Sequence, residues 1–94
     1  MKGVEYEFTC PAAPVQAEGT INGVPFYFRA RNEIWSFAVA ERSIQHPASI
    51  SSIEDGFYLE GTYGKSSFDA SFMPLGDASR IIEDCAKLFL KRTK

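Results

Sequence analysis

Residues 15–41, VQAEGTINGVPFYFRARNEIWSFAVAE, decide the fold because they contain two hairpin turns that agree on which side chains face inward. The first turn is Asn22-Gly23, the dipeptide that best tolerates the positive φ angles of a type I′ turn. The second is a two-residue turn at Asn32-Glu33. Each turn is expected to join two neighbouring antiparallel strands.

Counting outward from the two turns sends the same residues of the middle strand to the core, namely Phe26, Phe28 and Ala30. Each of them then faces one small or apolar residue on either side. The expected partners are Gly19, Ala17 and Val15 in the preceding strand and Val39, Phe37 and Trp35 in the following one. Because a one-residue slip would turn every side chain over, this agreement predicts a three-stranded antiparallel meander.

Two further segments, residues 4–10 and 57–63, also alternate apolar and polar residues. A period of two is typical of a half-buried strand. A turn at residues 64–65 would fold the chain back beside the second of these strands and set Ala70 opposite Leu59. These segments bring the expected sheet to five or six strands.

An apolar stripe at helical spacing predicts one α-helix near the end of the chain, with Asp77 as its N-cap. The stripe consists of Ala78, Ile81, Ile82, Cys85, Leu88 and Phe89. Residues 43–56 have no clear period, and we expect a short helical turn after Pro47. The sequence therefore predicts a single α+β domain over residues 1–94, in which an antiparallel sheet carries the C-terminal helix on its aromatic face.

Composition narrows the classes of function. Hydrophobic residues make up 45% of the chain and the formal net charge is −2, which indicates a packed globule and gives no electrostatic reason to expect a nucleic-acid partner. No apolar run is long enough for a membrane span or a signal peptide, so we expect a cytoplasmic protein. In that compartment Cys10 and Cys85 are expected to be buried reduced thiols, with a disulfide or a reactive thiol as the alternative.

Candidate catalytic and metal-binding residues are few. His46 is the single histidine and falls in the irregular segment, where a plain loop residue is expected and a general base or metal ligand is the alternative. Neither cysteine has a second ligand at metal-binding spacing, so no metal or cofactor is expected. The expected register would bring Glu60 opposite Asp69, either as an acid/base or cation site or as a solvated pair relieved by a nearby cation.

Tyr27, Arg29 and Arg31 alternate along the middle strand and point away from the core, with Glu18 and Ile34 nearby on the same outer face. Tyr and Arg are enriched at the energetic centres of protein interfaces. They also suit an ordinary solvated strand, which is the alternative interpretation. This row is therefore the candidate protein-binding site.

The sequence favours a small non-catalytic binding protein, such as an inhibitor, immunity-type or adaptor protein, that engages a protein partner through its outer sheet face. The alternative is a small-molecule-binding domain or minor enzyme with a pocket between sheet and helix, using Glu60, Asp69 or His46. A homodimer through the first strand, residues 4–9, is a further alternative because an edge strand can pair with another chain.

Overall fold

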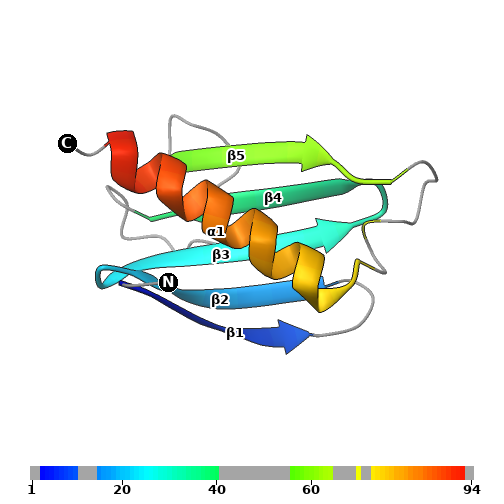
Figure 1. Ribbon diagram of the computed structural model, residues 1–94, viewed down its shortest axis with the longest axis horizontal. Helices are drawn as coiled ribbons and strands as arrows, with labels where there is room; N and C mark the ends of the chain where they lie inside the picture. Colours follow the sequence, from blue (N-terminus) through cyan, green and yellow to red (C-terminus); the bar gives the residue numbers. More distant parts are fainter. Residues whose placement is uncertain (1–2, 11–14, 41–55, 65–69, 71–72, 93–94) are drawn as a thin grey trace.

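The computed structural model describes residues 3–10, 15–40, 56–64, 70 and 73–92. Within these residues the chain forms one sheet followed by one helix (Figure 1). The elements are β1 (Val4–Cys10), β2 (Val15–Ile21), β3 (Val24–Arg31), β4 (Ile34–Val39), β5 (Phe57–Thr62) and α1 (Leu75–Arg92).

The strands follow one another in the order β1-β2-β3-β4-β5, and all neighbours are antiparallel. This confirms the meander. The register is also confirmed, because Phe28 lies between Ala17 and Phe37 as expected. Among the described non-glycine residues, positive φ occurs only at Asn22 (50°) and Asn32 (58°), one in each predicted turn.

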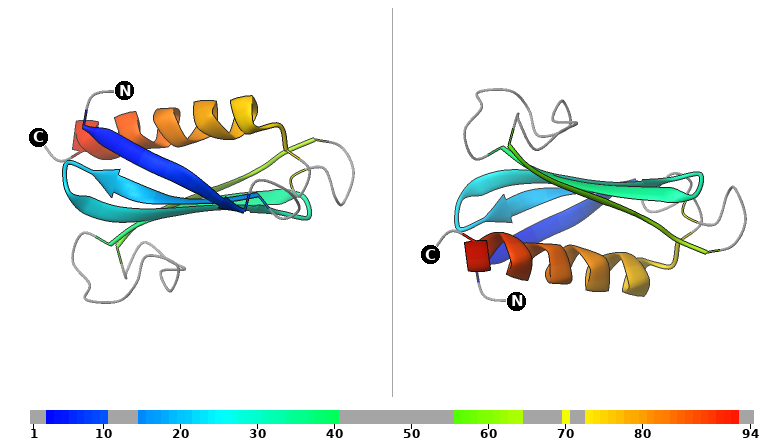
Figure 2. Two further views of the ribbon diagram at one scale, coloured as in Figure 1. Left: turned by 90° about the horizontal axis from the view of Figure 1, so that it is seen from below. Right: turned by 90° about the horizontal axis from the view of Figure 1, so that it is seen from above.

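The helix α1 crosses a single face of the sheet, which the edge-on views make clear (Figure 2). That face carries the fully buried rings Phe26, Phe28 and Phe37. Phe57 of β5 and Phe89 of α1 join the two layers, with ring centroids 5.2 Å apart in an edge-to-face arrangement. The opposite face of the sheet is therefore left free of the helix.

Two details of the helix differ from the expectation. Asp77 is not the N-cap, because α1 begins at Leu75 and the amides of Asp77 and Ala78 both donate to the carbonyl of Pro74 at 3.0 Å. Leu88 is 53% exposed, whereas the expected stripe placed it in the core. The residues of α1 that are buried against the sheet are Ala78, Ile82, Cys85, Ala86 and Phe89.

The expected pairing of Leu59 with Ala70 is wrong. Leu59 pairs with Phe37 of β4, and Ala70 lies in a short 3₁₀ turn. The Ala70 amide donates to the carbonyl of Asn32 at 2.8 Å, so it is satisfied at the β3–β4 turn and not by a strand. The neighbouring residues 65–69 and 71–72, and the helical turn expected after Pro47, lie outside the described residues.

Candidate functional site

The face of the sheet opposite α1 presents polar side chains in rows, because paired residues of adjacent strands point to the same side. One row places Ser36 of β4 between Arg29 of β3 and Glu60 of β5. The next row places Ile34 beside Arg31. We call this surface the outer face, and its rows carry the predicted binding residues.

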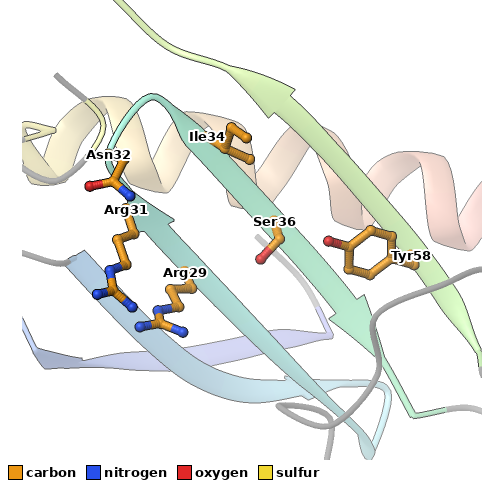
Figure 3. A pocket seen from close by; sticks show the side chains of 6 residues that line it. All are labelled: Arg29, Arg31, Asn32, Ile34, Ser36 and Tyr58. Carbon is orange, nitrogen blue, oxygen red and sulfur yellow. The ribbon is translucent and has the colours of Figure 1, made fainter. Parts of the chain in front are cut away.

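A shallow hollow of about 180 Å³ lies on the outer face over β3, β4 and β5 (Figure 3). Its lining consists of Arg29, Arg31, Asn32, Ile34, Ser36 and Tyr58. The structure thus brings together three of the predicted binding residues, Arg29, Arg31 and Ile34. Ile34 is 46% exposed, which leaves an apolar contact at the rim of a largely polar hollow.

The guanidinium group of Arg29 is incompletely satisfied. Its Nε atom is buried and has no hydrogen-bond partner in the part of the chain that the structure describes. Buried polar atoms in folded proteins almost always have a partner, so an exception calls for an explanation. Figure 3 shows Arg29 and Arg31 extending from β3 in the same direction, which places two positive charges side by side.

Tyr58 forms the far wall of the hollow. Its hydroxyl donates a hydrogen bond to Glu60 Oε2 at 3.0 Å. Burial raises the pKa of Tyr58, and the hydrogen bond and charge of Glu60 raise it further, while a hydrogen bond with Ser36 acts in the opposite direction. Tyr58 therefore stays protonated at neutral pH and acts as a hydrogen-bond donor.

The remaining predicted residues of the outer face lie beside the hollow. Glu18 and Tyr27 are a cross-strand pair of β2 and β3, both half-buried, and neither belongs to the lining. Sequence reasoning missed Asn32, Ser36 and Tyr58 as lining residues. The signal that could have found them is the β4–β5 register, which sets Val39 opposite Phe57 and so aligns Ser36 and Tyr58 on the outer face.

A second hollow, of about 270 Å³, lies between the helix and the β4–β5 end of the sheet. It is lined by Trp35, Leu59, Glu60, Ile81, Asp84, Cys85 and Leu88. Cys85 is a buried free thiol, and burial together with the charge of Asp84 raises its pKa to about 12. We call this space the helix-edge pocket. Its thiol is unreactive because almost none of it is ionised near neutral pH.

The structure describes only one of the two residues of the alternative acidic site. Glu60 is exposed on β5 and borders the helix-edge pocket, whereas Asp69 and His46 lie outside the described residues. In the described part of the chain, no group of three or more His, Cys, Asp or Glu side chains is arranged to hold a metal ion. No helix that the structure describes is both long enough and apolar enough to cross a membrane.

No protein-family model, curated protein or solved structure matches this chain.

Proposed function

We propose that this protein is a small non-catalytic binding protein, of the inhibitor, immunity-type or adaptor kind, that engages a protein partner through its outer face. The observation that supports this most strongly is the hollow on the outer face, which brings the guanidinium groups of Arg29 and Arg31 together with the exposed Ile34. A binding partner that offers acceptors to these guanidinium groups would gain charge-assisted hydrogen bonds.

The composition of the outer face supports the same proposal. Arg29, Tyr27 and Tyr58 are residue types that carry much of the energy in protein interfaces. Ile34 adds an exposed apolar side chain next to them. These side chains stand on three paired strands, so little backbone entropy is lost when a partner binds them.

The chemistry of the hollow is better suited to binding than to catalysis. Its lining, as far as the described residues go, combines two guanidinium groups with hydroxyl and amide groups and contains no Asp, Glu or His. A general base with a pKa near neutrality is the usual requirement for acid–base catalysis. Tyr58, with its raised pKa, does not meet it.

The partner can be isolated by affinity capture of the tagged protein from its native lysate and identified by mass spectrometry. The complex is then rebuilt from purified components, and backbone amide shifts are followed by NMR. We expect the largest changes around Arg29, Ile34 and Ser36. Changes confined to the solvent side of α1, around Arg80 and Lys87, would contradict the proposed surface.

We also propose that the protein is cytoplasmic. The free thiol of Cys85 supports a reducing, cytoplasmic setting.

A homodimer would use β1, which lies at the end of the sheet and exposes Glu5 and Glu7. These acids would discourage pairing between two copies, so E5Q/E7Q should raise any dimer fraction in sedimentation experiments. An unchanged fraction would argue against dimerisation through β1.

A second candidate function is small-molecule binding in the helix-edge pocket, favoured by its mostly apolar lining of Trp35, Leu59, Ile81 and Leu88. Trp35 is the single tryptophan of the chain, so a ligand in this pocket should change its fluorescence. A ligand at a hundred times its dissociation constant would also add about 2.7 kcal/mol to the stability. A broad library that changes neither fluorescence nor thermal stability would count against this candidate.

A further inference from the structure

The hollow on the outer face has the chemistry of a site for one anionic group. Two of the six described residues that line it are arginines, neighbours on the same side of β3, and none of these six is acidic. The protein as a whole carries a formal net charge of −2, so this local positive charge stands out from its surroundings. Arginine pairs of this kind suit planar anions, because each guanidinium group can donate two parallel hydrogen bonds.

The hollow has room for a small anionic group. About 180 Å³ can hold a carboxylate group together with a few waters, since one water occupies roughly 30 Å³ in the liquid. Ser36 and Tyr58 line the wall opposite the arginines, and the Tyr58 hydroxyl points toward Ser36 (Figure 3). Because the Tyr58 hydroxyl already donates its proton to Glu60, an anion that enters the hollow would take its hydrogen bonds from the guanidinium groups on the opposite side.

The guanidinium groups of Arg29 and Arg31 offer the hydrogen-bond donors for such a group. The buried Nε atom of Arg29 has no described partner and water does not reach it, so an incoming anion would use the terminal N–H groups instead. A charged acceptor would gain more from these donors than a neutral one, because charge-assisted hydrogen bonds are about twice as strong. Arg31 is exposed and can approach the same group from the solvent side.

The charges around the hollow favour a carboxylate over a phosphate. Glu60 accepts a hydrogen bond from Tyr58 at 3.0 Å and pairs with Ser36 in the sheet, so a negative charge stands next to the hollow. This charge offsets part of the positive potential of the arginines. The two arginines and Glu60 carry a formal net charge of about +1, which one carboxylate would neutralise and which a phosphate with nearly two negative charges would exceed.

We infer that the hollow between Arg29, Arg31 and Tyr58 binds the carboxylate of an acidic side chain presented by the protein partner. This inference rests on the proposed function for the source of the carboxylate. The chemistry of the hollow itself can be tested without the partner.

Acetate serves as the probe, followed through the Nε–Hε signals of the arginines in ¹⁵N-labelled protein at constant ionic strength. We expect acetate to shift the signals of Arg29 and Arg31 along a saturable curve and to leave the exposed Arg80 unaffected. Acetamide, which has the same shape and no charge, should have no effect. R29K should weaken acetate binding about 10-fold because lysine keeps the charge and loses the paired hydrogen bonds, whereas R80K should change nothing.

Inorganic phosphate is the competing probe. Phosphate that binds more tightly than acetate would overturn the assignment to a carboxylate, and the absence of saturable shifts with every probe would overturn the anion site. These results are distinct from failure of the proposed function. If only the proposed function were wrong, acetate would still bind, but the complex with the purified partner would be insensitive to R29A.

Discussion

The indole ring of Trp35 lies directly against Gly61, its cross-strand partner in β5. A Cβ atom at Gly61 would fall 2.7 Å from Trp35 Cζ2, closer than such atoms approach in folded proteins. The ring is half-buried and stacks on Phe28, with centroids 6.5 Å apart. The absence of a side chain at Gly61 is therefore what allows the tryptophan to cover this end of the sheet.

We expect G61A to destabilise the protein by about 1–3 kcal/mol, because the added methyl group must displace a packed ring. Chemical denaturation followed by circular dichroism and by Trp35 fluorescence measures the effect. G76A is the matched control. Gly76 lies in α1, and a Cβ added there would meet no side chain and no backbone outside its own helical turn within 4 Å, so alanine should stabilise the helix by up to about 1 kcal/mol. A G61A variant as stable as the parent would contradict the close packing.

The turn between β2 and β3 depends on the positive φ of Asn22, which is 50°. Asparagine tolerates this conformation because its side chain can hydrogen-bond to the nearby backbone, whereas alanine keeps the clash between Cβ and the following carbonyl without that compensation. N22A should therefore cost about 1–2 kcal/mol of unfolding free energy. N22G tolerates the same angle and should cost much less. Equal losses in the two variants would show that the side chain of Asn22, and not its backbone angle, holds the turn.

The hydroxyl of Tyr63 donates a hydrogen bond to the carboxylate of Asp77 and so joins the segment after β5 to the first turn of α1. Y63F should destabilise the protein by about 1.5–3 kcal/mol, because the acceptor is charged and partly buried. Y58F removes a similar hydrogen bond, to Glu60, at an exposed position and should cost less. The link would be refuted if Y63F lost no more stability than Y58F in urea titrations.

Cys85 makes stability depend on pH in the alkaline range. Its pKa rises from 9.0 to about 12 in the folded protein, so folding favours the protonated thiol. This contribution is fully present below pH 9 and is lost as the pH rises from 9 toward 12. We therefore expect the unfolding free energy to fall between pH 8 and pH 10 by more in the parent than in C85A. Parallel pH profiles would contradict the raised pKa.

The same thiol should react slowly. Iodoacetamide attacks the thiolate, which is scarce when the pKa is about 12. Mass spectrometry of the Cys85 peptide should show little alkylation of the native protein at pH 8 and rapid alkylation in denaturant. Equal rates in both conditions would mean that the thiol is neither buried nor shifted.

The meander could be predicted from the sequence because it is determined by local signals. Asn22 and Asn32 each mark a turn, and the strands beside them alternate in phase, so Phe26 and Phe28 could face only one way. Sequence alone predicts too late a start for α1, because the carbonyl of Pro74 accepts the first hydrogen bonds of the helix and leaves no side-chain signature. Element type was therefore easier to predict than its boundary.

The hollow could be predicted only in part for a different reason. Arg29 and Arg31 belong to one strand, and their common face follows from a period of two. Ser36 and Tyr58 join them only through the pairing of β4 with β5, and residues 40–56 separate these strands in the chain. No turn signal of the kind at Asn22 sets that register. The exposure of Leu88 likewise depends on how α1 crosses the sheet, which helical periodicity does not specify.

The affinity of the purified partner for the Y27A/R29A double variant, measured by calorimetry, tests the proposed binding surface most directly. Loss of a hot spot should weaken the complex by at least about 2 kcal/mol, roughly 30-fold in the dissociation constant. E83A/K87A, which removes charged side chains from α1, is the control and should bind like the parent. An unchanged affinity of Y27A/R29A, in a variant that remains folded, would show that the partner binds elsewhere.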